Sequence, residues 1–143
     1  MNAILLSAHV IAAILAVGPV AVAASMFPRY TRVLDGPDAA ARPVASALHR
    51  ICRTYAAVAL AVPVLGFATA ASMGVLTDAW VLVSIGLTAA AAVVLVAVIL
   101  PGQREALDGA AVTTLAMTTG VFNLLWVIVT ILMIVRPGSS TGV

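Results

Sequence analysis

The sequence predicts an all-α membrane protein, a bundle of four transmembrane helices with both termini outside the cytoplasm. Three observations carry this prediction. The 143 residues are 64% hydrophobic and only 8% charged, a composition more apolar than that of a soluble domain of this size. The few charges divide the chain into four long uncharged runs, and the arginines gather in alternate connections between these runs.

Each uncharged run is long enough to cross a bilayer. The runs cover residues 1–28, 54–77, 79–103 and 109–135, and each exceeds the roughly 20 residues that span about 30 Å of hydrocarbon. We expect helices over about 3–28, 52–76, 79–101 and 110–135, all within one integral membrane domain over 1–143. The first run lacks the basic start of a secretory signal peptide, so we expect it to remain as a helix.

The arginines predict the orientation. Five of them lie between the first two spans and Arg104 lies between the last two, whereas the opposite side has only Arg136. The positive-inside rule therefore places both of these connections in the cytoplasm. Tyr30 and Tyr55 then fall at the inner interface and Trp80 at the outer one, where amphipathic rings are expected.

The connection between the first two spans combines a turn with a basic helix. Residues 35–38, Asp-Gly-Pro-Asp, predict the turn, and Pro43 suits the first turn of a helix that runs through Arg53 into the second span. The arginines of this region either serve only to set the topology or form a cytoplasmic docking patch for anionic lipid or an acidic partner surface. The members of this predicted basic patch are Arg29, Arg32, Arg50 and Arg53.

Small residues in the second span predict close helix packing. Gly66, Ala70 and Gly74 recur every four residues, a spacing that lets another helix approach the backbone. We therefore expect the second span to be the central helix, with a local kink at Pro63. Cys52 has no disulfide partner and no CxxC spacing, so we interpret it as a packing residue.

The fourth span is the most polar of the four. Thr119, Asn123, Trp126 and Thr130 fall on one stripe by helical spacing. An asparagine near the bilayer centre is typical of hydrogen bonding between helices. The alternatives are a polar site and a contact with another subunit.

His9 places an ionisable side chain inside the apolar run LLSAHVIAAILAVGP, which makes it a candidate functional residue. It is either a buried neutral imidazole, hydrogen-bonded to a hydroxyl at similar depth such as Thr130 or Ser72, or an axial ligand of haem iron. His49 is expected on the opposite side of the bilayer, on the order of 30 Å away. One chain is therefore not expected to supply two histidines to one iron.

Other patterns that would indicate chemistry are absent. The four predicted spans contain no Asp or Glu, which proton-coupled transport normally uses, and the methionines form no copper-binding spacing with His9. Nucleophile triads, phosphate-binding loops and nucleic-acid motifs are also missing. We expect no catalytic residue, no metal site, no nucleic-acid partner and no cofactor other than haem at His9.

Four stretches carry a resemblance to a known group of proteins: AHVIAAILAVGP, FPRY, RICRTY and ALAVPVLGFATA. Mainly over residues 5–75, the chain resembles small four-helix bacterial membrane proteins that include an uncharacterised family, copper-resistance D-type domains and the membrane protoporphyrinogen oxidase. The resemblance implies a four-helix fold. In the oxidase branch a histidine near the start of span 1 binds haem, a position that His9 matches, and Arg29 matches an arginine after that span.

The chain departs from the oxidase branch at two points. That branch has a tryptophan within span 1 and a lysine in span 3, and neither is present here. The likeness is therefore greater to the uncharacterised branch, which implies a fold and no reaction.

These observations favour a non-catalytic accessory subunit of the bacterial plasma membrane. Its partners would be the lipid bilayer and other membrane-protein subunits, with a respiratory-chain oxidase assembly as the concrete candidate. The alternative is a haem-binding, oxidoreductase-like membrane protein that uses His9.

Overall fold

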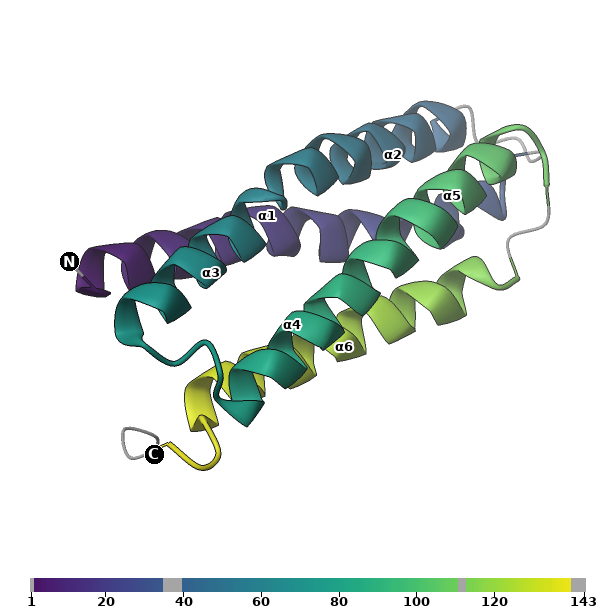
Figure 1. Ribbon diagram of the computed structural model, residues 1–143. Helices are drawn as coiled ribbons and strands as arrows, with labels where there is room; N and C mark the ends of the chain where they lie inside the picture. Colours follow the sequence, from purple (N-terminus) through teal and green to yellow (C-terminus); the bar gives the residue numbers. More distant parts are fainter. Residues whose placement is uncertain (1, 35–39, 111–112, 140–143) are drawn as a thin grey trace.

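The computed structural model describes residues 2–34, 40–110 and 113–139, which form helices joined by turns. The elements are α1 Asn2–Thr31, α2 Ala41–Val58, α3 Ala61–Met73, α4 Ala79–Val93, the π-helical segment η1 Val94–Ile99, α5 Leu100–Leu107 and α6 Leu115–Val135 (Figure 1). Among the described residues, four stretches are long and apolar enough to cross a membrane: Ala3–Thr31, Ala41–Met73, Ala79–Leu107 and Leu115–Val135. The predicted all-α fold with four transmembrane helices is confirmed.

The second and third spans are longer than their apolar sequences predict. The second begins at Ala41 instead of about residue 52, as expected from Pro43, and the third ends at Leu107 instead of about 101. The helices can extend into these charged segments because helical hydrogen bonding does not require an apolar side chain. The extra turns expose their charged residues and bury Ala45 and Ala106. The last span begins at Leu115 instead of about 110. The predicted turn at 35–38 lies outside the described residues.

The second span is interrupted where Pro63 predicts a kink. Proline has no N–H to donate, and its ring clashes with the carbonyl four residues earlier, here that of Ala59. The backbone responds with tighter turns, in which Leu60 N donates to Ala57 O at 3.2 Å and Val62 N donates to Ala59 O at 3.1 Å. This break separates α2 from α3.

The third span contains a π-helical turn before its own proline. Segment η1 ends two residues before Pro101, which is the second residue of α5. A π-turn accommodates an extra residue without ending the helix. Leu95 and Ile99 of η1 are buried in the core, so the third span keeps an apolar face toward the core through the π-helical turn.

The second span is not the central helix. Helix α1 packs against α2, α3, α5 and α6, and the third span also meets the other three, whereas α3 packs mainly on α1 and meets α4 at few points. The prediction of a central second span is therefore wrong. The physical reason lies in α1, where Ala16, Ala23 and Ala24 are buried and let neighbouring helices approach on more than one side.

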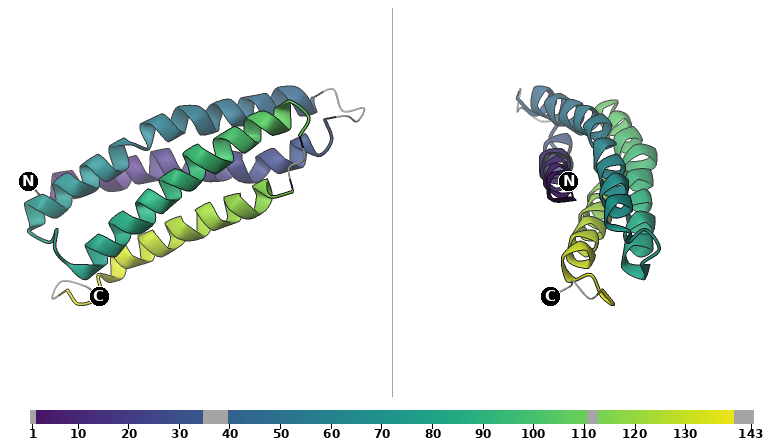
Figure 2. Two further views of the ribbon diagram at one scale, coloured as in Figure 1. Left: turned by 45° about the vertical axis from the view of Figure 1, so that its right-hand side comes forward. Right: turned by 60° about the vertical axis from the view of Figure 1, so that its left-hand side comes forward.

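The bundle is closed at one end and open at the other. The basic end carries the connections after α1 and α5, and there α1, α2, α5 and α6 lie together (Figures 1 and 2). The terminal end carries the start of α1 and the end of α6, and there the α1–α3 pair lies apart from the α4–α6 pair except where α3 turns into α4. We call the two parts the closed half and the open half.

The two halves have cores of different size. The core of the closed half receives residues from all four spans: Val20, Ala23, Ala24, Phe27, Ala45, Leu48, Cys52, Ala91, Leu95, Ile99, Ala106, Leu115 and Phe122. The open half has a small cluster of Ala70, Trp80 and Val81, with Met133 packed against it. Trp80 donates from Nε1 to Asp78 Oδ2 at 3.2 Å, and the Arg136 guanidinium lies 5.7 Å from its ring centroid.

Candidate functional site

His9 lies at the contact between α1 and α3, just beyond the break in the second span. Its Nδ1 is 3.0 Å from the backbone oxygen of Val62, and the residue is only 7% exposed. Because a carbonyl only accepts, Nδ1 carries the proton of this bond, and Nε2 takes no part in it. The polar partner of His9 is thus a backbone carbonyl of α3.

The predicted hydroxyl partners of His9 are wrong. Thr130 donates to the carbonyl of Trp126 at 2.8 Å, and Ser72 donates to that of Thr69, also at 2.8 Å. Both hydroxyls are satisfied by their own helices, as is common for Ser and Thr in helices.

The three small residues of the second span have three different roles. A Cβ on Gly66 would lie 2.8 Å from His9 Cε1 and 3.2 Å from Nδ1, so the imidazole rests on the glycine backbone. Ala70 is buried against Trp80 and Val81. Gly74 is the exposed C-cap of α3, with φ +71° and open space around it. Within this chain Gly74 ends a helix and does not pack against one, contrary to the prediction.

A buried polar cluster in the closed half was not predicted from the sequence. Gln103 of α5 is 0% exposed; its Oε1 accepts from His49 Nδ1 at 2.9 Å, and its Nε2 lies 3.4 Å from Cys52 Sγ. Cys52 in turn donates to Val20 O at 3.9 Å. The one available signal was the polar residue within the run 79–103, which places Gln103 level with the helical extension around His49.

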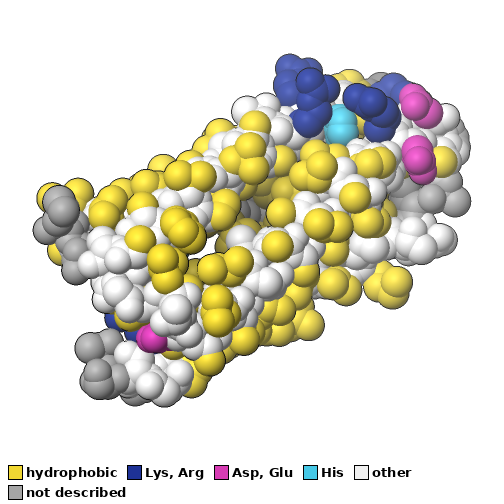
Figure 3. Space-filling model, viewed as in Figure 1, with side chains coloured by type: hydrophobic (Ala, Val, Ile, Leu, Met, Phe, Trp, Pro, Cys, Tyr) yellow, Lys and Arg dark blue, Asp and Glu magenta, His cyan; other side chains and the backbone are white. Residues whose placement is uncertain are grey.

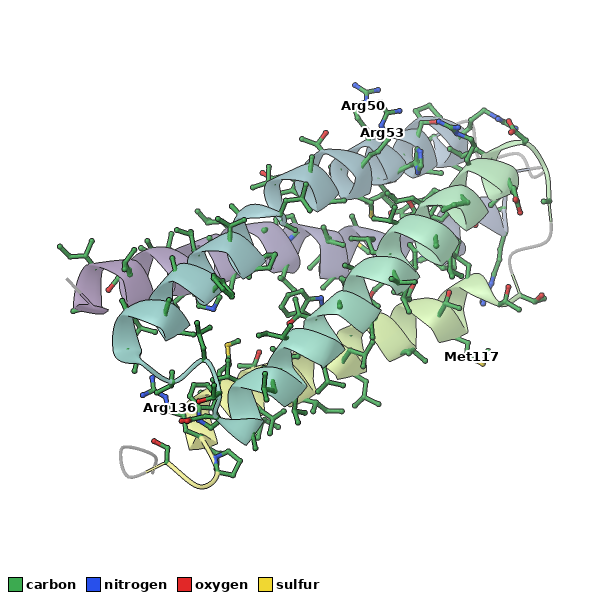
Figure 4. All side chains as sticks on the ribbon, in the orientation of Figure 1. Arg50, Arg53, Met117 and Arg136 are labelled. Atoms are coloured by element: carbon green, nitrogen blue, oxygen red, sulfur yellow. The ribbon has the colours of Figure 1, made fainter. Side chains whose placement is uncertain are left out.

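The predicted basic patch is divided between two faces. Arg50 and Arg53 point outward from α2 (Figure 4), and Figure 3 shows arginines gathered at the basic end. Arg29 and Arg32 instead line a pocket of about 440 Å³ between the end of α1 and the start of α6. The arginines that the sequence grouped together therefore serve different surfaces.

The residues of the polar stripe on α6 also differ in their hydrogen bonding. Asn123 Nδ2 donates to Ser25 Oγ of α1 at 3.0 Å, which is the predicted bond between helices. Thr119 is buried, yet its Oγ1 has no hydrogen-bond partner among the described residues, and neither have Asn123 Oδ1 and Trp126 Nε1. Thr130 is exposed and bonds within its own helix. A buried polar group without a partner costs about 1–3 kcal/mol, so Thr119 and Asn123 call for an explanation.

His9 is the candidate metal ligand of α1. Within residues 2–34, 40–110 and 113–139, no three His, Cys, Asp or Glu side chains gather to hold a metal ion. The His9 tautomer leaves Nε2 available as a ligand, in the arrangement that orients histidines toward iron. The pocket between α1 and α6 and a shallow one along the start of α1 do not include His9 in their walls.

Comparison of the chain with models of protein families, with curated proteins and with solved structures found no match. The resemblance to small four-helix bacterial membrane proteins therefore stays a prediction, and function must be argued from the geometry.

Proposed function

We propose that the chain is a non-catalytic accessory subunit that packs laterally against a larger membrane protein complex. The observation that carries this proposal is the open half, where two helix pairs lie apart at one end of a bundle that is closed at the other. Figure 3 shows the surface hollowed between α3 and α4. The proposed occupant is a transmembrane helix of the partner.

The residues expected at this cleft suit helix packing. Ala70 and Val81 meet in the core of the open half, and residues seven and eleven positions away share their faces. Within the helices these are Pro63 on α3 and Thr88 and Ala92 on α4. Small side chains let a further helix approach closely, and in lipid such van der Waals contact drives helix association.

Affinity purification in a mild detergent tests this proposal. We expect a membrane protein to copurify in fixed stoichiometry, and the subunits of a respiratory-chain oxidase assembly are the first to look for. Ala92→Trp should abolish copurification, whereas Ala90→Trp, on the opposite face of α4, should preserve it. Isolation of the folded chain alone, or equal behaviour of the two variants, would reject the proposal.

The second candidate function is haem binding at His9. What supports it is the tautomer, because the Nδ1–H bond to Val62 makes no use of Nε2, which is the ring nitrogen that a metal would need. Haem would supply redox chemistry to the chain. A dithionite-reduced minus oxidised absorbance spectrum of the purified protein should then show a haem band that is lost in His9→Ala and kept in His49→Ala. A flat spectrum from folded protein would exclude this function.

The proposed setting is the bacterial plasma membrane, with the basic end in the cytoplasm. The arginines at that end support this orientation through the positive-inside rule. A reporter active only in the cytoplasm should be inactive when fused after residue 143 and active when inserted in the connection after α5. The reverse pattern would invert the topology.

A further inference from the structure

The pocket between α1 and α6 contains a buried hydroxyl that has no hydrogen-bond partner in the part of the chain that the structure describes. Buried polar side chains among the described residues are His9, Thr69, Ser84, Gln103 and Thr119. The first four are hydrogen-bonded, Thr69 and Ser84 to carbonyls of their own helices at 2.7 Å. Thr119 is 3% exposed, lines the pocket and has no partner. Buried hydroxyls rarely remain unpaired, so the pocket is expected to hold a ligand.

Asn123 adds a second unmatched group to the same wall. Its Nδ2 donates to Ser25 Oγ at 3.0 Å, and its Oδ1 is buried without a partner. Turning the amide by 180° lets the Ser25 hydroxyl donate to Oδ1 and frees Nδ2 as a donor, because the two amide atoms are similar in size. The wall can then present two donors, the Thr119 hydroxyl and the Asn123 amide, to acceptors of a ligand.

Two arginines stand at the mouth of this pocket. Arg29 lies in the last turn of α1 and Arg32 in the turn that follows it; both are exposed, and neither makes an ion pair within the described residues. Arg32 N still donates to Pro28 O at 3.3 Å, as in a helix, so the two side chains lie on the same side, and guanidinium groups match the geometry of phosphate oxygens. The described lining residues include no acidic side chain. The mouth of the pocket therefore favours a phosphate group that belongs to a ligand of net negative charge.

The order of these groups along the helices matches the order of groups in a phospholipid. Arg29 lies four residues beyond Ser25 on α1, roughly 6 Å along the axis at 1.5 Å per residue, and Arg32 follows the end of the helix, so the arginines are at the basic end and the donors are deeper. A glycerophospholipid presents its phosphate at the interface and its ester carbonyls below. Deeper still, the exposed Val22 of α1 and Val127 of α6 continue the same helix faces, which suits acyl chains.

We propose that this pocket binds the phosphate and ester region of a net-anionic glycerophospholipid from the leaflet at the basic end. Arg29 and Arg32 hold the phosphate, and Thr119 and Asn123 donate to the ester carbonyls. The site lies on a different surface from the cleft between α3 and α4. It therefore does not depend on the accessory role, and each can fail alone.

The test is a titration of the detergent-purified full chain with dioleoylphosphatidylglycerol, followed by native mass spectrometry. We expect one retained lipid, with dioleoylphosphatidylcholine retained far less. The double variant Arg29→Gln/Arg32→Gln should bind roughly thirty-fold more weakly, from about 1 kcal/mol per arginine. The matched control Arg50→Gln/Arg53→Gln removes the same charge from the outer face of α2 and should bind as the native chain does.

A second pair of variants tests the deeper part of the site. Thr119→Val removes the unpaired hydroxyl and keeps its shape, so lipid retention should fall several-fold. Thr130→Val, which removes a hydroxyl bonded within its own helix, should have no effect. Equal retention of both lipids, or equal loss in the two arginine pairs, would overturn the proposal. Displacement of the lipid by millimolar inorganic phosphate would overturn it as well, because the site would then belong to a soluble anion.

Discussion

The closed and open halves of the bundle differ in how their helices are held together. In the closed half, all four spans contribute to one core, which also encloses the bonded cluster of Gln103, His49 and Cys52. In the open half, a three-residue cluster and the bond from His9 to Val62 join neighbouring helices. Lipid is as apolar as these side chains, so hydrophobicity does not decide where helices meet. Small residues and polar bonds do.

The largest expected effect comes from emptying the core of the closed half. Phe27 is 0% exposed and Phe67 of the open half is 60% exposed. Phe27→Ala should lower the free energy of unfolding by about 2–3 kcal/mol, somewhat less than in soluble proteins, because only the lost packing counts in lipid. Phe67→Ala should change it by less than about 0.5 kcal/mol. Unfolding by sodium dodecyl sulfate, followed by circular dichroism, measures both, and equal losses would contradict the division into halves.

The contact of His9 with Gly66 should be the most sensitive point of the open half. Gly66→Ala places a Cβ 2.8 Å from His9 Cε1, which displaces the ring from Val62 O and should cost about 1–2 kcal/mol. Gly86→Ala on α4 meets nothing within 4 Å and should be neutral or stabilising by up to about 1 kcal/mol.

A double variant separates this collision from a general effect of alanine in α3. His9→Ala removes the displaced ring, so adding Gly66→Ala to it should cost little further. The same denaturation measurement applies, and a full additive loss in the double variant would refute the contact.

The buried amide of the closed half should have a smaller effect. Gln103→Leu keeps the volume but removes the partner of His49 and Cys52, and we expect a loss of about 1 kcal/mol. His49 is half-buried and can turn to water, which limits the cost. A double-mutant cycle with His49→Leu should give a coupling of about 0.5 kcal/mol or more, whereas zero coupling would mean that the 2.9 Å bond is not stabilising.

The smallest effect on stability is expected at Thr119, whose hydroxyl has no hydrogen-bond partner among the described residues. In lipid-free detergent, Thr119→Val should change the unfolding free energy by less than about 0.5 kcal/mol or raise it, because no protein bond is lost. Thr69→Val, which loses a bond of 2.7 Å to Leu65 O, should be the more destabilising of the pair. Thermal unfolding in detergent compares them, and a larger loss at Thr119 would reveal a partner within the protein.

Features that depend on local chemistry were predictable from the sequence. Four helices follow from uncharged runs longer than a bilayer is thick. The break before Pro63 follows from its missing N–H, and Asn123 was correctly expected to bond between helices. The helical extension from Ala41 could be inferred from Pro43, although hydropathy alone placed the start of the span near residue 52.

For part of the candidate site, the sequence identified the important residues but not their partners or roles. His9 was identified as the polar residue to explain, but its acceptor is a backbone carbonyl, which every residue carries and no sequence pattern marks. Gly74 fits the small-residue spacing equally well as a packing position and as a helix cap, and its φ of +71° decides for the cap. Gln103 gave little signal because one polar residue near the end of an apolar run is common.

The sequence alone thus specifies that four apolar helices are long enough to cross the membrane and where one of them breaks. Segment length, hydropathy and the missing N–H of a proline are local properties, so they do not depend on which other helix is the neighbour. The placement of the helices decides the rest: that the second span is not central, that Val62 bonds to His9, and that Arg29 and Arg32 stand apart from Arg50 and Arg53. In lipid an apolar face gains little by choosing a protein neighbour over an acyl chain. Lateral contacts therefore depend on how small residues and polar groups meet in three dimensions.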